Sequence, residues 1–534
     1  MLIVNDTISL ELLKKLKLEE KEVYYLVDYE IVVKFAHLNH SSAIKTNQDM
    51  KKFFICMMTL LVGVCGALCA KPKPEQKAVT PKYVFYFISD GTGVNAILGT
   101  EIMLSELKGE LGRTPLWMSK SPVVGLSSTY STSSDVTDSA ASGTALASGT
   151  KTYNGGLGVY PDSVTPAISV AQKAHDQGWI VGIGTSCPVN HATPGAQFAH
   201  VPDRNMYYEI ARQMEGTGFE FFGGASINLE RKHNKPEVRD SIYNALRKAG
   251  YTICFTNEDY ARDGKSADKV LMLQGDVPDS YSLPYWIDRK PGQVTIVDQF
   301  KAELELLYRK SQEKNTGFFL FNETGGKVDY ACHAHDGATA FQEVLAADSC
   351  MGIALEFYRQ HPDETLIVLT SDHETGGLSL GCEYGGYKTN FKILQYQKVS
   401  IDEANRNMQA LAKKAGGMTK LTWEEAKAQL AADFGLWSHI PVTEAEEARL
   451  KGLFDKTVSG EATDTRTLYA SSKAFMTAAL HLVQDKAHVG WTTGGHTAGL
   501  VPVYAVGIGK EEFMGHNDNA EIPLKIAKIM GVKM

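Results

Sequence analysis

The segment VTDSAASGTA at residues 136–145 is small, nearly uncharged and rich in alanine and glycine. It follows the apolar run PVVGL at residues 122–126, which predicts a buried strand. Alanine favours a helix, and Thr137 and Asp138 are suitable N-cap residues. We therefore predict a strand followed by a helix with Ser139 in its first turn, where free backbone N–H groups and the helix dipole favour an anion. A serine at that position is either a cap residue or a nucleophile.

Strands and helices alternate along most of the chain. This alternation predicts an α/β fold with a mostly parallel central sheet and helices on both faces. Such sheets bind ligands beyond the carboxyl ends of their strands, so we expect the functional residues there. The predicted strands include residues 82–89, 179–184, 316–321, 365–370 and 501–508, and the clearest helices residues 167–177, 298–310 and 338–359.

The composition changes between about residues 384 and 490, which are rich in lysine, glutamate and alanine. Helical patterns at residues 423–434 and 444–454 predict helices there. We interpret this segment as a helical insertion within one α/β domain that spans residues 82–534.

Residues 50–70 have the pattern of a secretory signal peptide, with two lysines before an uncharged apolar run. A signal peptide normally begins a protein, so we interpret residues 1–49 as a non-native upstream extension. Residues 71–81 are polar and proline-rich and predict a linker. The alternative to a cleaved signal is a signal anchor, because the apolar run is nearly long enough to span a bilayer. A cleaved signal predicts an exported protein, periplasmic or extracellular, with no stable membrane span in the mature chain.

The composition, 43% hydrophobic and 22% charged over 534 residues, is typical of a globular protein. The formal net charge of −8 gives no indication of a nucleic-acid-binding surface, so any anion pocket must be local. The cysteines outside the predicted signal peptide are odd in number, so at least one is expected to be free. They are Cys187, Cys254, Cys332, Cys350 and Cys382.

Acidic and histidine side chains occur at four predicted strand ends. Carboxylate oxygens and imidazole nitrogens suit zinc. Six of them are about right for two ions that each keep an open position, and two such ions can clamp the attacking and leaving oxygens of an in-line displacement. The candidate ligands are Asp90, Asp329 with His333 one helical turn later, Asp372 with His373, and His496 in a glycine-rich loop.

Two further residues fit phosphoryl transfer at such a site. Ser139 would supply the nucleophile, and Arg204 the planar two-pronged contact that phosphoryl oxygens favour. Each has a simpler alternative, because Ser139 could be a helix cap and Arg204 a surface ion pair beside Asp203. Asp329 and His333 could likewise be a helix-face pair. The neighbouring His335 and Asp336 have no matching role.

In order and general spacing, these motifs resemble those of the alkaline phosphatase family over roughly residues 82–534. The serine segment at residues 136–145 is close to the family signature. The other matching motifs are DGTG at residues 90–93, Thr193-Pro194 with Arg204, residues 329–333, Asp372-His373, and HTAG at residues 496–499. The resemblance implies a metal-dependent hydrolase of small phosphate monoesters that forms a homodimer.

The resemblance also implies a role for each residue. Ser139 would become phosphorylated, and Arg204, positioned by Asp138, would bind the phosphoryl oxygens. One Zn²⁺ would be held by Asp329, His333 and His496, and a second by Asp90, Asp372 and His373. A third ion, usually Mg²⁺, would be held by Asp90, Thr193 and a glutamate.

The third-ion position departs from the family pattern. The family glutamate stands five residues before the aspartate of the Asp329 type, whereas here that position is Thr324 and Glu323 is six residues before. Either a local bulge brings Glu323 into place or the third site is altered. His191 stands where some members have aspartate, which favours a softer ion or a water-filled site over magnesium. Tyr330 stands where other members carry lysine or histidine.

Two other classes of function remain open from the sequence. A phosphodiesterase, sulfatase or phosphomutase of the same superfamily would use a similar scaffold. A diesterase would need room for a second ester group where Arg204 is expected. The second class is a secreted metal- or phosphate-binding protein without turnover.

Overall fold

The computed structural model describes residues 80–275, 282–461, 464–466, 468–469 and 471–534. The predicted upstream extension, the predicted signal peptide and the linker up to residue 79 lie outside the described residues. Within the described part of the chain, no helix combines the length and the apolar character that crossing a bilayer requires.

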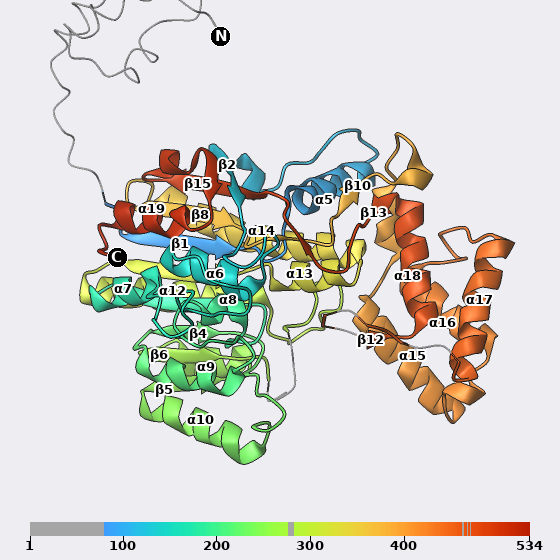
Figure 1. The fold of residues 1–534 in the computed structure, drawn as a ribbon, viewed down its shortest axis with the longest axis horizontal. Coiled ribbons are helices and arrows are strands. Elements are labelled where there is room, and N and C mark those ends of the chain that lie inside the picture. Colours follow the sequence, from blue (N-terminus) through green and yellow to red (C-terminus); the bar gives the residue numbers. More distant parts are fainter. Residues whose placement is uncertain (1–79, 276–281, 462–463, 467, 470) are drawn as a thin grey trace, which may run out of the picture. The chain divides into compact units, whose positions relative to one another are not determined.

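A ten-stranded sheet is the centre of the described chain (Figure 1). In spatial order its strands are β16 (Gly515–Asp518), β2 (Val123–Ser128), β15 (Val501–Gly507), β8 (Thr365–Thr370), β1 (Tyr83–Ile88), β7 (Phe318–Glu323), β3 (Ile180–Thr185), β4 (Phe221–Gly223), β6 (Lys269–Met272) and β5 (Tyr251–Cys254). β1 pairs in parallel with β7 and β8. In this sheet only β15 runs antiparallel to its neighbours, β2 and β8. The predicted mostly parallel sheet is therefore confirmed.

Successive side chains of β1 enter two separate hydrophobic clusters. Phe85 and Phe87 belong to the first cluster. Val84 and Tyr86 belong to the second. Because side chains alternate across a strand, the two clusters lie on opposite faces of the sheet. Both faces are covered, as the sequence predicts.

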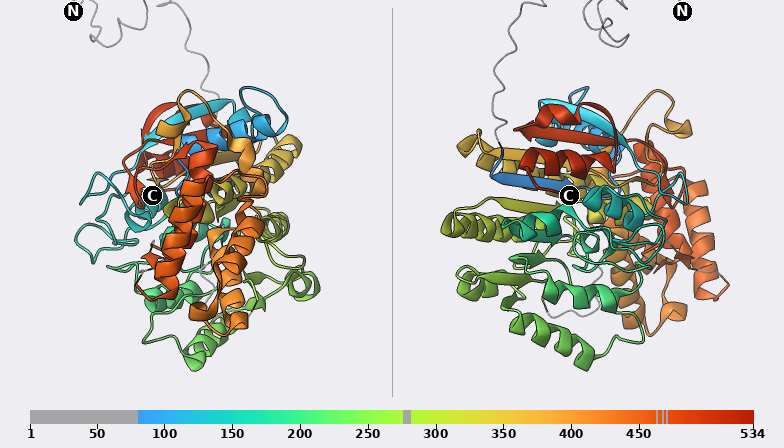
Figure 2. Two further views of the ribbon diagram at one scale, coloured as in Figure 1. Left: turned by 90° about the vertical axis from the view of Figure 1, so that its right-hand side faces the viewer. Right: turned by 60° about the vertical axis from the view of Figure 1, so that its left-hand side comes forward.

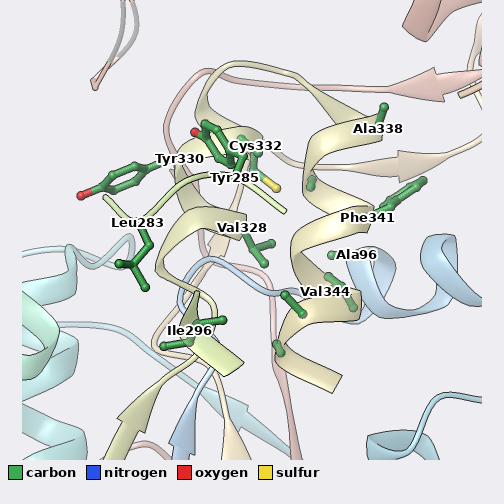
Figure 3. Packing of buried hydrophobic residues seen from close by; sticks show 14 of the residues in the cluster. Ala96, Leu283, Tyr285, Ile296, Val328, Tyr330, Cys332, Ala338, Phe341 and Val344 are labelled. Carbon is green, nitrogen blue, oxygen red and sulfur yellow. The ribbon is translucent and has the colours of Figure 1, made fainter. Parts of the chain in front are cut away.

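The helices lie on both sides of the sheet (Figure 2), and their buried side chains divide between these two clusters. The first cluster takes buried side chains from α5 (Val94–Leu107), α12 (Ile296–Lys314), α13 (Gly326–His333) and α14 (Gly337–Gln360). The second takes them from α6 (Ser139–Ser148), α7 (Val170–Asp176), α8 (Ala192–Gly195), α9 (Tyr207–Gln213), α10 (Pro236–Lys248) and α19 (Glu521–Met530). Figure 3 shows part of the first cluster, with Val328 between α13 and α14 and Ala96 of α5 against α14.

The lysine- and alanine-rich segment forms helices, and their buried residues join the first cluster. α16 coincides with its predicted range because Thr422 and Glu425 form a capping box and Gly435, with φ of 74°, ends the helix. These helices lie together on the right of Figure 1. They are α15 (Ile401–Ala415), α16 (Trp423–Phe434), α17 (Glu444–Val458) and α18 (Ala474–Ala487), with the hairpin of β11 (Thr465–Arg466) and β12 (Ser471–Ser472) before α18.

The run at residues 122–126 forms β2, but the prediction of a buried strand is wrong. Val123 is buried, whereas Val124 is 53% exposed and Leu126 37% exposed. β2 is the second strand from one edge of the sheet, beside the short β16. One face of β2 is therefore open to solvent. An apolar run alone does not distinguish this position from the sheet centre.

The alanine-rich segment forms α6, and its small residues are explained by close packing. Every residue of α6 is buried. A Cβ atom added to Gly143 would lie 3.3 Å from the Cα of Thr193, at the start of α8. Asp138 caps α6, with its Oδ1 accepting a hydrogen bond from the backbone N–H of Ala141 at 3.0 Å. Ser139 is therefore the first residue of the helix, as predicted.

Candidate metal centre

The candidate ligands gather at one edge of the sheet. Asp90 follows β1, Asp372 and His373 follow β8, and α13 begins just after β7. These strands are parallel neighbours, so their carboxyl ends meet. Gly91, with φ of +70°, lets the turn after β1 approach α13 closely. A Cβ atom added to Gly91 would lie only 2.5 Å from the Asp329 Cα.

His496 also lies at this edge of the sheet, but it does not follow the end of a strand as predicted. It lies in β14 (His496–Thr497), which pairs with β9 (Glu374–Thr375) and comes before β15 rather than after a strand. Because β15 is antiparallel to β8, the start of β15 lies at the carboxyl end of β8. The predicted glycine-rich loop at residues 490–497 therefore contains a short paired strand.

Asp90, Asp372 and His373 form one buried group. Their ligand atoms lie within 4.8 Å of one another. The His373 Nε2 is 3.1 Å from Asp372 Oδ2 and 3.6 Å from Asp90 Oδ1. Burial, followed by repulsion from Asp372, holds the pKa of Asp90 well above its usual value. A carboxyl so placed gains from a bound cation.

Asp329, His333 and His496 form the second group, also within 4.8 Å. The Asp329 Oδ1 lies 3.3 Å from His333 Nε2 and 3.7 Å from His496 Nε2. The Nδ1 of His333 is 2.7 Å from the carbonyl oxygen of Gly494, and that of His496 is 2.8 Å from the carbonyl oxygen of Thr137. Such carbonyl partners place the proton on Nδ1 and turn the Nε2 lone pair toward the site.

Ser139 lies beside both groups. Its Oγ is 3.2 Å from His373 Nε2. The rings of His373 and His496 are stacked with centroids 3.5 Å apart. The predicted nucleophile and the six predicted zinc ligands are thus brought together.

Arg204 is not a surface ion pair with Asp203. Its Nη1 donates to Asp138 Oδ2 at 3.0 Å, and its Nη2 lies 3.3 Å from His191 Nε2. Burial raises the pKa of Asp138, but the Arg204 charge and the backbone N–H of Ala141 outweigh burial and keep it below its usual value.

The remaining predicted residues lie next to Asp90. The Thr193 hydroxyl donates to Asp90 Oδ2 at 3.1 Å. Glu323 is the last residue of β7 and pairs in regular register with Ile88 and Thr185. Glu323 is therefore brought here by the end of an unbulged strand, and the extra residue, Thr324, lies in the turn before α13.

His191 and Glu323 also have a neighbour that the sequence analysis did not select. The Cys187 Sγ lies within 4.8 Å of their ligand atoms. The Thr185 hydroxyl donates to Glu323 Oε2. A cysteine four residues before His191, just after a strand, was the available signal.

Tyr469, in the β11–β12 hairpin, is a second residue that the sequence analysis missed. Its ring stacks on Tyr330 with centroids 3.9 Å apart and meets His333 edge-on at 5.3 Å. No sequence signal marks Tyr469, because its position depends on how the insertion packs.

His335 and Asp336 have structural roles, in keeping with the sequence interpretation. His335, with φ of 55°, stacks on Trp491. Asp336 caps α14 by accepting from the Thr339 backbone N–H at 3.1 Å.

The donor atoms of the two groups fit cations. Asp90 Oδ1 and Asp329 Oδ2 are buried and lack a hydrogen-bond partner within the described residues, whereas Asp372 Oδ2 has an ion-pair contact with His373 Nε2 at 3.1 Å. Buried carboxylate oxygens without partners are costly unless a cation is present. Carboxylate and imidazole donors in sets of three match the protein ligands of catalytic zinc.

Comparison with known proteins gives one family. The sequence profile described as "Alkaline phosphatase" matches residues 81–274 and 230–532. An alkaline phosphatase of Schizosaccharomyces pombe is 29% identical over 455 residues, which cover 83% of this chain and 80% of that protein. Alkaline phosphatase 3 of Bacillus subtilis is 27% identical over 490 residues, covering 89% and 95% of the two chains.

Solved structures agree with this match. The cold-active alkaline phosphatase of Shewanella sp. superposes with a TM-score of 0.69 at 27% identity, covering 84% of this chain and 99% of that one. The alkaline phosphatase of Thermus thermophilus gives a TM-score of 0.69 at 26% identity, covering 87% and 96%.

Proposed function

The chain belongs to the alkaline phosphatase family and is a metal-dependent phosphatase of phosphate monoesters, and from that premise we propose that it works through a phosphoserine on Ser139 at a two-zinc centre. The observation that carries this proposal is the position of the Ser139 Oγ, 3.2 Å from His373 Nε2 and at the N-terminus of α6. His373 belongs to the same buried group as Asp90 and Asp372.

Asp90, Asp372 and His373 would hold one zinc ion, and Asp329, His333 and His496 the other. When bound, two such ions act as Lewis acids on the attacking and leaving oxygens of an in-line displacement. The carbonyl groups of Gly494 and Thr137 keep His333 and His496 in the orientation that this ligation needs.

Arg204 would bind two oxygens of the phosphoryl group through its planar guanidinium. Asp138 Oδ2 accepts a hydrogen bond from Arg204 Nη1 at 3.0 Å, and this contact would orient the guanidinium before substrate binds. Most of the rate gain should come from such positioning and charge compensation, because the phosphoryl transition state needs little covalent assistance.

In the first step the Ser139 hydroxyl loses its proton and its Oγ forms a bond to phosphorus, while the bond from phosphorus to the ester oxygen breaks and that oxygen takes up a proton to leave as the alcohol. In the second step water attacks the phosphoserine, the bond to Oγ breaks, and phosphate is released. The free N–H groups of the first turn of α6 favour the negative charge that develops near Ser139 in both steps.

The test compares Ser139→Ala with wild type in aryl phosphate hydrolysis at alkaline pH, with zinc measured in both proteins. Ser148→Ala is the matched control, since Ser148 is in the same helix and its hydroxyl contacts local backbone, donating to the Thr144 carbonyl at 2.8 Å and accepting from the Thr150 N–H at 3.1 Å. We expect Ser139→Ala to lose turnover by orders of magnitude and to keep its zinc. Near-wild-type turnover in Ser139→Ala would remove the nucleophile assignment.

Acid quenching and a matched aryl diester distinguish the remaining alternatives. A phosphatase would accumulate phosphoserine at low pH and prefer the monoester, because a second ester group would need room where we propose that Arg204 binds the phosphoryl oxygens. Preference for the diester would assign the chain to a phosphodiesterase of the same superfamily. Bound phosphate without phosphoserine or turnover would indicate a binding protein.

We also infer export and a homodimer. Export is supported by the lysines and apolar run at residues 50–70, and mass spectrometry of the native precursor tests it. Peptides from residues 1–49 in that precursor would contradict the proposed start at Met50. Light scattering of the purified chain measures the oligomeric state.

A further inference from the structure

We propose that Cys187, His191 and Glu323 bind a third, thiophilic divalent cation such as zinc, with Cys187 as a ligand. The family resemblance implies a different donor set, Asp90, Thr193 and a glutamate for magnesium. The inference goes beyond the proposed phosphatase function, because it concerns a binding site that exists whether or not Ser139 turns over substrate.

The fold brings the three residues together at the edge that carries the two-metal centre. Cys187 follows β3, Glu323 ends β7, and β3 and β7 are parallel neighbours. His191 is the N-cap residue of α8. The three ligand atoms lie within 4.8 Å of one another. A zinc ion bonds its ligands at about 2.0–2.3 Å, so atoms that share one ion lie at most about 4.6 Å apart, which is close to this separation.

Two unpartnered atoms accompany the thiol. His191 Nδ1 and Glu323 Oε1 are buried and lack a hydrogen-bond partner within the described chain. Cys187 and Glu323 are fully buried, and His191 is 3% exposed. A polar atom that is buried without a partner is costly, and a bound cation would satisfy both.

The backbone leaves room for the thiol at this position. Gly326 begins α13, and a Cβ atom there would lie 2.4 Å from the Cys187 Sγ and 3.3 Å from the Glu323 Cδ. A side chain at residue 326 would therefore fill the space between the two candidate ligands.

The donor set indicates the class of cation. Magnesium requires oxygen ligands in octahedral geometry, whereas thiolate and imidazole favour zinc, cobalt and similar ions. Thiolate and carboxylate together would balance a divalent charge. The thiol proton is released to solvent when the ion binds.

The contact between His191 and Arg204 adds a constraint. Arg204 can only donate, so the 3.3 Å contact uses the Nε2 lone pair and leaves the proton on Nδ1. Ligation through Nδ1 therefore requires the tautomer to switch and the Arg204 contact to open. This frees Nη2 of Arg204, while Asp138 still holds Nη1.

The alternative is that Cys187 only packs. It belongs to the first hydrophobic cluster and pairs with the Tyr330 phenol. Buried cysteines of this kind are commonly inert. A metal-binding measurement separates the two roles.

The experiment strips the full-length protein of metal and reloads it with Co²⁺ alone. We expect a near-ultraviolet thiolate-to-cobalt charge-transfer band in wild type, and its loss in Cys187→Ser. Zinc loading followed by gel filtration should give about three ions per wild-type chain and about two per Cys187→Ser chain. Cys382→Ser is the control, since this free thiol lies outside the metal groups and should keep both the band and the third ion.

The wild-type spectrum decides the proposal even if Cys187→Ser does not fold. A fully cobalt-loaded wild type without the thiolate band would overturn it, as would displacement of the third zinc by magnesium alone. The same spectrum in Ser139→Ala separates this proposal from the phosphatase mechanism, because that variant should keep the band after turnover is lost.

Discussion

Asp138 binds Arg204 with one carboxylate oxygen and caps α6 with the other. Oδ2 accepts from Arg204 Nη1 at 3.0 Å, and Oδ1 accepts from the backbone N–H of Ala141 at the same distance. One side chain therefore fixes both the helix that presents Ser139 and the guanidinium that faces it. The two functions can be separated by substitution.

Asp138→Ala removes both functions, whereas Asp138→Asn keeps a good cap and removes the charge. We expect Asp138→Ala to lose about 1 kcal/mol of unfolding free energy, and Asp138→Asn a few tenths. Both should lower kcat/KM by about 10- to 100-fold, since a hydrogen bond between charged groups is lost. Urea unfolding and steady-state kinetics measure the two effects. Unchanged kcat/KM in Asp138→Asn would show that Arg204 needs no positioning by Asp138.

Tyr469 links the helical segment to the site. Tyr469→Ala removes the 3.9 Å stack on Tyr330 and the edge contact with His333. An aromatic pair contributes about 0.5–1.5 kcal/mol, so the free energy of unfolding should fall by about that amount, and KM for an aryl phosphate should rise because His333 loses a neighbouring ring. Tyr469→Phe keeps the ring and should behave as wild type. Equal kinetics for wild type and Tyr469→Ala would place the hairpin outside the working site.

Asp433, in α16, gives a pH-dependent test away from the metal centre. Its carboxylate accepts from Asn407 and Gln429 at 3.0 Å each, but burial raises its pKa to about 6. The folded-state pKa lies above the unfolded value, so the folded protein holds the proton more tightly. Its contribution therefore destabilises the fold as pH rises from about 4 to about 6.

Asp433→Asn should remove this loss and exceed wild-type stability at pH 7 by at most about 3 kcal/mol. The measurement is urea unfolding of both proteins, zinc-saturated, at several pH values between about 5 and 8. The difference between them should grow with pH and then level off. A constant difference across that range would contradict an elevated Asp433 pKa.

Metal removal should lower stability as well as activity. Without cations, the carboxylates of Asp90 and Asp372 share a buried site beside the His373 imidazole. A site held at about 100 times its Kd contributes about 2.7 kcal/mol, so chelation should lower Tm by several degrees. Calorimetry and metal analysis before and after chelation measure this, and added zinc should restore Tm and turnover together. Full activity in verified metal-free protein would end the metalloenzyme proposal.

Much of the fold was predictable because local patterns were strong. The apolar run at residues 365–370 coincides with β8, and the capping box of Thr422 fixes the start of α16. β2 was misjudged because exposure depends on its place in the sheet. The short β6 was not predicted, since four residues carry little periodicity.

The residues of the candidate site likewise fall into those that the sequence predicted and those that only the fold brings together. Asp372 with His373, and Asp329 with His333, were visible because the partners are close in sequence. Cys187 was missed because its neighbour Glu323 belongs to a different strand, and only the pairing of β3 with β7 brings them together. The position of Glu323 was left open by the sequence and depends on where β7 ends.

The proposed two-metal centre draws on distant parts of the chain, with Asp90 after the first strand of the sheet and His496 just before the antiparallel β15. Assembly of the centre must therefore wait until nearly the whole chain has been synthesised. A nascent or C-terminally truncated chain holds most of the ligands but lacks the one that closes the second group. Tight zinc uptake is then a late event, and it can serve as a reporter that β15 has docked.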